Sequence, residues 1–195
     1  MKQIVLASNN PGKQREIAEL LAPLGIEVIP QARLGIGEAE EPHATFLENA
    51  LAKARHASRA SGLPALADDS GLCVDALGGA PGVHSAYYAG REGSREERDA
   101  RNNAKLLASL GDERKAHYRC VMALVHGADD PEPLVAEGTW QGEIARVPRG
   151  ANGFGYDPLF LLPGRGVTAA ELPPEEKNRV SHRGRAAARL LAALR

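Results

Sequence analysis

The sequence predicts a mixed α/β fold whose sheet is partly parallel and partly antiparallel. Helix and strand patterns alternate through the first half of the chain, and two strand patterns follow one another directly in the second half. The 195 residues, 43% of them hydrophobic, suffice for a sizeable core. We therefore expect residues 1–195 to form a single domain with two lobes.

The first strand and helix are marked by a change from apolar to polar residues. Residues 4–7 are apolar and stop sharply at polar residues, which is typical of a buried strand. Asn10 is suited to cap a helix, and Pro11 fits its first position. Gly25 ends this helix, and residues 26–29 form a second strand. Apolar side chains follow the caps at helical spacing: Ile17, Leu20, Leu21 and Leu24.

The next helix begins with a capping box at Thr45 and Glu48. It is rich in alanine and runs to about Ser61, where Gly62-Leu63-Pro64 breaks it. Residues 65–67 form another short strand, directly before two aspartates. We expect the pair 68–69 to lie at the end of that strand.

The second half starts with another capping box, at Ser94 and Glu97, which opens a helix that ends near Gly111. Residues 118–125 and 134–140 have strand patterns with a turn between them, so an antiparallel hairpin is expected. The last helix has apolar side chains at helical spacing: Ala187, Leu190, Leu191 and Leu194.

Composition excludes several classes of protein. The net charge of −1 gives no overall field that would attract nucleic acid or an anionic membrane. No apolar run approaches the length of a membrane span, and the N-terminus reaches polar Ser8 too soon for a signal peptide. We therefore expect a cytoplasmic protein. Cys73 and Cys120 lie in apolar runs and are interpreted as reduced core thiols.

The segment from Ser8 to Lys13 is the first candidate site, because it joins a strand to a helix. The N–H groups and the dipole of a helix N-terminus favour phosphate. Gly12 lets the chain approach an anion closely, and Lys13 adds a charge that the helix dipole disfavours. An ordinary capped helix with a solvated lysine remains the alternative. The segment consists of Ser8, Asn9, Asn10, Pro11, Gly12 and Lys13.

Carboxylates provide the second candidate site. Asp68 and Asp69 repel each other unless a cation lies nearby, and Mg²⁺ commonly uses one or two carboxylates together with phosphates. The acidic run 38–41 offers a further carboxylate for the metal. Two solvated aspartates in a turn, and acidic residues that complement the next helix dipole, are the alternatives.

A glycine-rich loop with two aromatic residues, 153–157, is suited to stack on a base and to bind its edge. Lys53 could reach a phosphate. Lys177 and the cations His182 and Arg183, in the first turn of the last helix, suggest a nearby anion or polar ligand. A loop anchored in the core by one aromatic ring, and ordinary surface charges, remain the alternatives.

Five segments occur in an order that resembles the inosine triphosphate pyrophosphatase family, whose bacterial members act on non-canonical purine nucleoside triphosphates. The resemblance covers essentially the whole chain, with serine in place of the frequent threonine at the first position. The segments are Ser8-x-Asn10-x-x-Lys13, Ala67–Gly71, Leu77–Gly82, Gly153–Pro158 and Ser181–Gly184.

The resemblance implies an elongated mixed sheet flanked by helices, with two lobes and a central cleft, and a homodimer. The implied reaction is the Mg²⁺-dependent hydrolysis of XTP, ITP or dITP to the monophosphate and pyrophosphate. Asp69 would bind the metal with Glu40 and accept a proton, although Glu38 or Glu41 could replace Glu40, and Asp68 has no assigned role. Substrate-binding residues carried over by motif are 8–13, Ser70, Phe154, Gly155, Tyr156, Asp157, Lys177, His182 and Arg183.

Two other functions remain possible from the sequence. One is a pyrophosphatase for modified pyrimidine triphosphates, which would not be expected to carry the segments 153–157 and 181–184. The other is a nucleotide-binding module without catalysis, which would not need a carboxylate pair beside its phosphate site. For a purine substrate, His182, Arg183 and N–H groups of the loop are candidate donors to a 6-oxo group.

Overall fold

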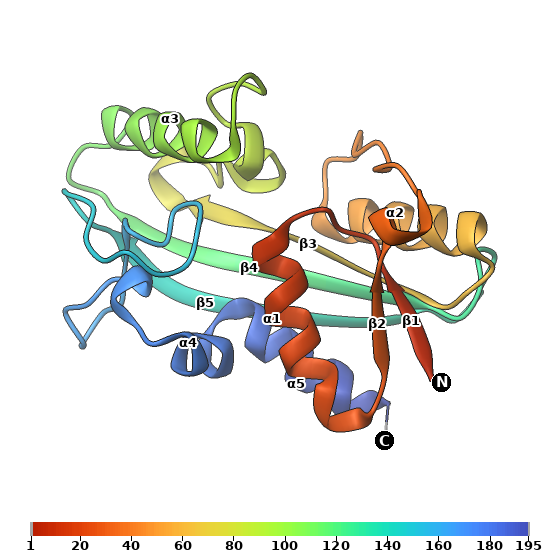
Figure 1. Cartoon of the computed structure of the whole chain (residues 1–195). Helices are drawn as coiled ribbons and strands as arrows, with labels where there is room; N and C mark the ends of the chain where they lie inside the picture. The colour runs from red at the N-terminus through yellow and green to blue at the C-terminus, as the bar shows by residue number, and fades with distance from the viewer. Residues whose placement is uncertain (1, 195) are drawn as a thin grey trace. The chain divides into compact units, whose positions relative to one another are not determined.

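The computed structural model describes residues 2–194 and contains a six-stranded sheet (Figure 1). The sheet is mixed, as predicted, because β1 is parallel to β2 and β3 whereas β6 is antiparallel to β5. In spatial order the strands are β2 (Glu27–Pro30), β1 (Gln3–Leu6), β3 (Ala65–Val74), β4 (Lys115–Val125), β5 (Leu134–Ile144) and β6 (Phe160–Leu161).

The helices accompany the strands along the chain. The α-helices are α1 (Pro11–Leu21), α2 (Phe46–Ser61), α3 (Arg95–Ala108), α4 (Pro174–Val180) and α5 (His182–Ala193). Short 3₁₀ helices occupy Ala22–Leu24, Gln31–Leu34, Asp75–Leu77, Gly82–Tyr87 and Ala169–Glu171.

Contacts divide the chain into two compact units, and three of the four boundaries between the units fall inside β3, β4 and β5. The single domain expected over residues 1–195 and the cleft expected between its lobes stay predictions. Residues 1 and 195 lie outside the described residues. The first unit comprises Met1–Asp69, Cys120–Gly138 and Arg183–Arg195, and the second comprises Ser70–Arg119 and Thr139–His182.

In the first unit, β1 and the start of β3 carry apolar side chains on both faces, because α2 covers one face and α1 and α5 cover the other (Figure 1). Side chains alternate between the faces of a strand. Leu6 and Leu66 therefore pack with α1 and α5, whereas Val5 and Ala67 pack with alanines of α2. This alternation decides where the polar residues that follow in β3 point.

The caps predicted for the first helix are confirmed. Asn10 has extended backbone angles and its side chain accepts a hydrogen bond from the N–H of Lys13, with Pro11 at the first helical position. Gly25 closes the following 3₁₀ turn in the left-handed conformation that glycine adopts readily. The capping box at Ser94 and Glu97 is also confirmed.

The predicted end of the third strand is wrong. The strand does not stop at Ala67 but runs on through both aspartates to Val74. The polar residues suggested a turn, but inside the strand each aspartate has a cationic partner, so the extended backbone does not leave a bare charge in the core. Asp68 and Asp69 are consequently strand residues.

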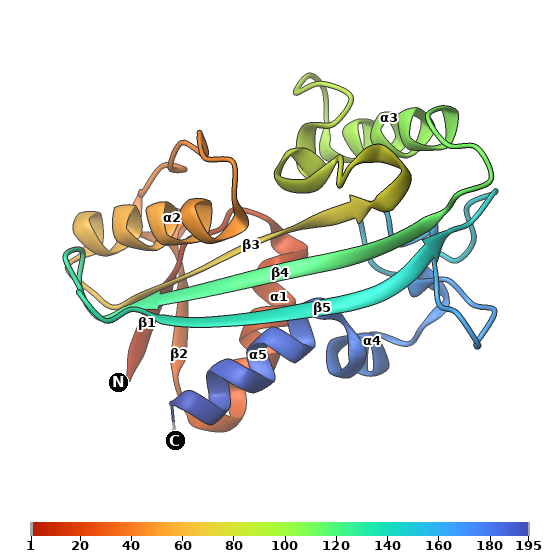
Figure 2. The same ribbon diagram turned by 180° about the vertical axis from the view of Figure 1, so that it is seen from behind.

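The antiparallel hairpin is confirmed, since β4 and β5 are neighbours whose arrows run in opposite directions (Figure 2). The short strand β6 and helix α4 were not expected. Thr45 forms only part of the predicted capping box, because its hydroxyl accepts from the N–H of Glu48 and donates to that residue's carboxylate.

The second unit has its own core. Aromatic and aliphatic side chains from β3, α3, β4 and β5 pack there with residues of the segment 156–172. Tyr118 and Phe160 are in ring contact, as are Trp140 and Phe160. This core holds the loop before Phe160 in place.

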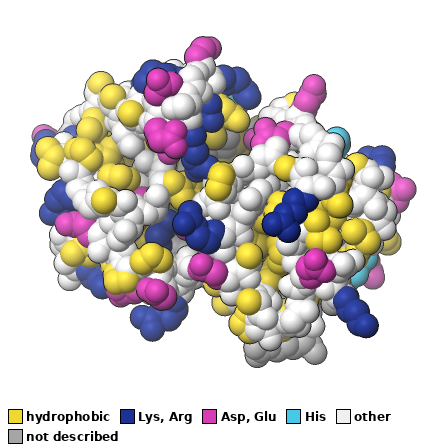
Figure 3. Space-filling model, viewed as in Figure 1, with side chains coloured by type: hydrophobic (Ala, Val, Ile, Leu, Met, Phe, Trp, Pro, Cys, Tyr) yellow, Lys and Arg dark blue, Asp and Glu magenta, His cyan; other side chains and the backbone are white. Residues whose placement is uncertain are grey.

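Both cysteines are buried and carry free thiols, as predicted. Over residues 2–194, no helix combines the length and the apolar character needed to cross a bilayer. Acidic and basic side chains are interspersed on the face that Figure 3 shows, in keeping with the net charge of −1.

Candidate active site

The turn between β1 and α1 is fixed by side chains from its own unit. The hydroxyl of Ser8 accepts from the N–H of Asn10 at 3.2 Å. Gln31 donates to the side-chain oxygen of Asn9, and Gln14 donates to the carbonyl of Ser8 at 2.7 Å. The turn therefore holds the N-terminus of α1 in one arrangement, which is what binding of phosphate by helix N–H groups requires.

Asp68 is a buried carboxylate between two cations. Its Oδ1 lies 2.6 Å from Nζ of Lys13, and its Oδ2 accepts from Nε of Arg183 at 2.7 Å. The thiol of Cys120 donates to the same Oδ2 at 3.2 Å. Arg183 also forms an ion pair with Glu16 of α1 at 2.5 Å. Asp68 thereby joins α1 to α5 within the first unit.

Asp69 belongs to a different cluster. Nζ of Lys53 lies 2.7 Å from Oδ1 of Asp69 and 2.7 Å from Oε1 of Glu41. The same ammonium donates to the backbone carbonyl of Asp68 at 3.1 Å. Lys53 thus gathers the carboxylates of the second aspartate and of the acidic run around one charge.

The two aspartates separate because consecutive strand residues point to opposite faces of a sheet. Asp68 points to the face covered by α1 and α5, which carry Lys13 and Arg183. Asp69 points to the face covered by α2, which carries Lys53. The repulsion that we expected between adjacent carboxylates is therefore relieved by two separate sets of cations, and a metal is not needed to relieve it.

The environments of the two carboxyl groups differ in their effect on acidity. Burial by itself would raise the pKa of Asp68, but Arg183 and Lys13 outweigh it and hold that pKa well below its ordinary value. Burial raises the pKa of Asp69, and Lys53 offsets this only in part. For Lys53, burial would lower the pKa, but Asp69 and Glu41 raise it above the ordinary value. Asp69 is thus the more basic of the two aspartates.

The residues around Asp69 fit a divalent cation completed by other ligands. Its Oδ2 is buried and has no hydrogen-bond partner within residues 2–194, so one carboxylate oxygen can accept a ligand. In the same part of the chain, no three His, Cys, Asp or Glu side chains lie close enough to hold a metal by themselves. Mg²⁺ does not need such a cage, since it commonly binds one or two carboxylates with water and phosphate. Three cations here face four carboxylates: Lys13, Lys53 and Arg183 against Glu16, Glu41, Asp68 and Asp69.

The second unit holds the glycine-rich loop around Asp157. Its Oδ2 accepts from the N–H of Phe154 at 2.9 Å and lies 2.7 Å from Nζ of Lys177. Gly153 has a positive φ, and a Cβ there would collide with the Asp157 carboxylate. Nζ of Lys177 lies 4.9 Å from the centre of the Phe154 ring. The loop therefore presents an aromatic ring beside a buried ammonium.

Two N–H groups that we considered as donors to a base are already engaged. The N–H of Phe154 donates to Asp157, and the N–H of Gly155 donates to Asp99 at 3.0 Å. These two N–H groups are therefore not available to a base in this structure.

Some other predicted site residues are buried in the protein or contact other protein side chains. Tyr156 is buried, and its hydroxyl donates to the carbonyl of Ser85 at 2.8 Å, so its ring is the core anchor of the loop. The ring of His182 stacks on Tyr118 at 4.5 Å between centroids. Ser70 is half-buried in β3, and Glu40 is exposed while its neighbour Glu41 reaches Lys53.

Several further residues support the site and were not predicted from the sequence. The pattern offered only weak signals for them, such as a buried glutamine after a strand or a glutamate one turn after Lys13. These residues are Gln14, Glu16, Gln31, Asp99, Asn103 and Cys120, all of which contact a predicted site residue or Asp68.

Known proteins resemble this chain over its whole length. The model of the Ham1 family matches residues 4–193. The dITP/XTP pyrophosphatase of Burkholderia pseudomallei is 64% identical over 98% of this chain and 93% of its own, and that of Ralstonia nicotianae is 64% identical over 100% and 98%. A solved structure of a HAM1 protein from Coxiella burnetii is 50% identical, covers 100% of this chain and 98% of its own, and superposes with a TM-score of 0.90. The Staphylococcus aureus Ham1 protein is 42% identical with a TM-score of 0.85, covering 99% and 98%.

Proposed function

The chain belongs to the Ham1 family, and from that premise we propose that it hydrolyses XTP, ITP and dITP to the monophosphate and pyrophosphate. Relatives at 64% identity that carry the name dITP/XTP pyrophosphatase support this substrate class. The observation in the structure that carries the proposal is the Asp69 carboxylate, held through Oδ1 by Lys53 and with Oδ2 buried and available. A binding module without catalysis would have no use for such a group.

Hydrolysis that releases pyrophosphate requires attack of water on the α-phosphorus. The reaction needs a positioned water, a group that takes its proton, and positive charge around the phosphates. Asp69 is suited to orient the water and accept the proton, because burial raises its pKa above the ordinary value of an aspartate. Lys13, Lys53 and the N-terminus of α1 supply positive charge for the triphosphate.

We assign Mg²⁺ to Asp69 and to one glutamate of the acidic run. Glu40 is the residue that the family resemblance indicates, whereas Glu41 is the one whose carboxylate shares Lys53 with Asp69. This shared contact with Lys53 favours Glu41 as the second metal ligand. When bound, Mg²⁺ would neutralise phosphate charge and lower the pKa of a coordinated water. Lys53 would then hold the two carboxylates next to one another.

We assign base recognition to the second unit. Phe154 offers an aromatic face, and Lys177, held by Asp157, offers a cation that can only donate hydrogen bonds. A 6-oxo purine can accept from such a donor, whereas the 6-amino group of adenine would leave it unpaired. Ser70, Tyr156, His182 and Arg183 keep the substrate-binding roles that the resemblance gives them, although the side chains of Tyr156 and Arg183 are tied to the protein in this structure. We further propose a cytoplasmic homodimer without a nucleic-acid partner.

Release of pyrophosphate from a panel of nucleotides tests the proposal. The panel is ITP, XTP, dITP, GTP, ATP and UTP, each with and without Mg²⁺. We expect turnover of the first three in Mg²⁺ and little turnover of ATP. Comparable rates on ATP and ITP would refute the base scheme, a preference for UTP would favour a pyrimidine enzyme, and binding without turnover would favour a regulatory module.

A further inference from the structure

Helix α3 hydrogen-bonds to both backbone groups, the N–H and the carbonyl, of Gly155 at the centre of the loop 153–157. Oδ2 of Asp99 accepts from the N–H of Gly155 at 3.0 Å, and Nδ2 of Asn103 donates to the carbonyl of Gly155 at 3.0 Å. The two side chains are four residues apart and therefore lie on one face of the helix. We call this pair of residues, Asp99 and Asn103, the α3 clamp.

The loop needs such an anchor because its own sequence does not stiffen it. Gly153 and Gly155 both have positive φ, and glycine loses more conformational freedom on ordering than any other residue. Asp157 fixes one end of the loop through the N–H of Phe154. The clamp fixes the middle, one residue further along.

The clamp is also connected to the aromatic ring of the loop. Nε of Arg95 lies 3.8 Å from Oδ2 of Asp99, and the Arg95 guanidinium lies 4.8 Å from the centre of the Phe154 ring. Lys177 lies 4.9 Å from the centre of the same ring. The position of Phe154 thus depends on two cations, one held by Asp99 and the other by Asp157.

We propose that Asp99 and Asn103 are positioning residues that determine base selectivity, by fixing Gly155 and with it the arrangement of Phe154 and Lys177. A donor discriminates against adenine only if it cannot move to relieve the mismatch, because a mobile loop would let the unpaired group turn to water. The inference rests on the proposed function, since it concerns the base that the enzyme accepts. It adds a helix that neither the motifs nor the resemblance assigned to the site.

Selectivity measurements on clamp variants test the proposal. Asp99→Leu and Asn103→Leu each remove one hydrogen bond to Gly155, whereas Asp99→Asn keeps a carbonyl acceptor. Arg101→Leu is the matched control, because Arg101 lies on the same helix and donates to the carbonyl of Glu92 instead of the loop. The ratio of kcat/KM for ITP to that for ATP is measured with Mg²⁺ for each folded variant.

The two leucine variants are expected to lower this ratio about threefold to tenfold, the scale of one lost hydrogen bond. The fall should come mainly from a rise in kcat/KM for ATP, because a mobile loop lets the unpaired donor turn to water, while Asp99→Asn and Arg101→Leu keep the parent ratio. Backbone amide exchange at Gly155 should be faster in the leucine variants. If Asp99→Leu does not fold, the uncharged change Asn103→Leu still decides the question.

An unchanged ratio in folded leucine variants would overturn the inference, and so would an equal loss on ITP and ATP, which would indicate a merely structural role. Failure of the proposed function has a different signature. In that case the unmutated protein would release no pyrophosphate from ITP.

Discussion

Lys53 holds Asp69 by one carboxylate oxygen only. The ammonium of Lys53 lies 2.7 Å from Oδ1, whereas Oδ2 is buried without a hydrogen-bond partner in the part of the chain that the structure describes. A buried carboxylate oxygen without a partner is costly unless a ligand completes it. We therefore expect substitution of Asp69 to reduce turnover more than substitution of its neighbour Asp68.

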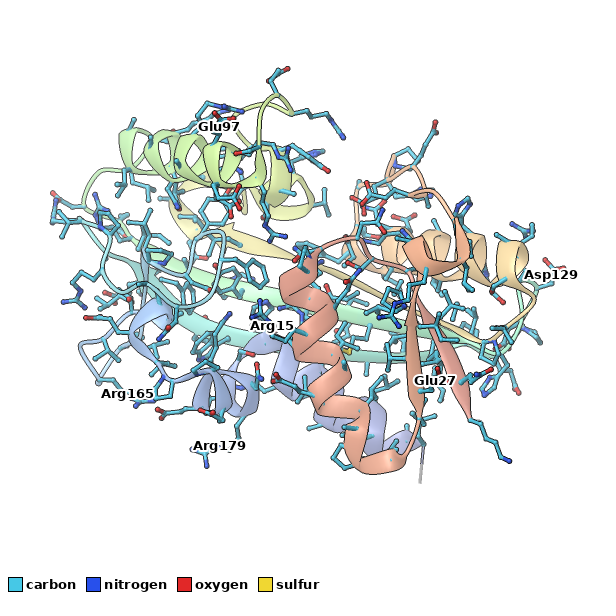
Figure 4. All side chains as sticks on the ribbon, viewed as in Figure 1. Arg15, Glu27, Glu97, Asp129, Arg165 and Arg179 are labelled. Atoms are coloured by element: carbon cyan, nitrogen blue, oxygen red, sulfur yellow. The ribbon has the colours of Figure 1, made fainter. Side chains whose placement is uncertain are left out.

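Asp69→Asn should reduce turnover of ITP by about a thousandfold, the scale expected when the group that accepts the proton of the attacking water is lost. Nucleotide binding should survive in part, because Lys13 and the N-terminus of α1 remain. Steady-state pyrophosphate release and calorimetric titration with ITP separate the two effects. Asp129→Asn is the control, since Asp129 is exposed and points away from the fold (Figure 4). Substantial residual turnover in Asp69→Asn would contradict the assignment.

Glu41→Gln should raise the Mg²⁺ concentration needed for half-maximal activity by about tenfold or more, as loss of a group that binds or orients a metal typically does. Glu38→Gln and Glu40→Gln serve as controls of equal charge in the same acidic run. Activity against Mg²⁺ concentration is measured for all three variants, and a chelator should stop turnover of the parent protein. If Glu40→Gln raised the Mg²⁺ concentration for half-maximal activity and Glu41→Gln did not, Glu40 and not Glu41 would be the metal ligand.

Asp68→Asn should destabilise the fold by about 3 kcal/mol, because it leaves the buried cations Lys13 and Arg183 without their main partner. Denaturant unfolding at neutral pH measures the change. Asp129→Asn removes an exposed ion pair with Arg59 and should change stability little. A loss in Asp68→Asn no larger than in this control would show that Glu16 alone balances Arg183.

Tyr156→Phe should cost about 1 kcal/mol near pH 7 through loss of the buried hydrogen bond to Ser85. Burial raises the pKa of Tyr156 well above its ordinary value, so the folded protein keeps the hydroxyl protonated when the unfolded chain does not. The advantage of tyrosine is thus complete below about pH 10, the ordinary pKa of tyrosine, and declines above it. Unfolding curves of both proteins at pH 7 and above pH 10 check this, and a constant difference would contradict it.

Local sequence signals predicted the elements whose ends are set by local chemistry. The caps of α1 and α3 and the glycine after α2 depend on side chains only a few residues away. The length of β3 could not be predicted in this way. Its polar centre is stable as a strand only because Lys13, Lys53 and Arg183 arrive from distant parts of the chain.

In the candidate site, too, some residues could be predicted from local sequence signals, whereas others depend on long-range contacts. The sequence pointed to Lys13, Lys53, Asp69, Phe154 and Lys177 because their types and neighbours suit nucleotide chemistry. It could not assign Asp68, whose partner Arg183 is 115 residues away. Nor could it show that Gly155 is held by α3, since Asp99 and Asn103 carry no pattern beyond that of an ordinary helix surface.

The sequence by itself determined the α/β class, the helix caps, the family and the chemical types gathered for a triphosphate and a base. Only the tertiary structure decided which cations pair with Asp68 and which pairs with Asp69. Adjacent residues in a strand point to opposite faces, so packing of α1 and α5 on one face and α2 on the other gave Asp68 two cations and left Asp69 one. Side-chain direction and long-range pairing are properties of the folded sheet, and a linear pattern of residue types does not contain them.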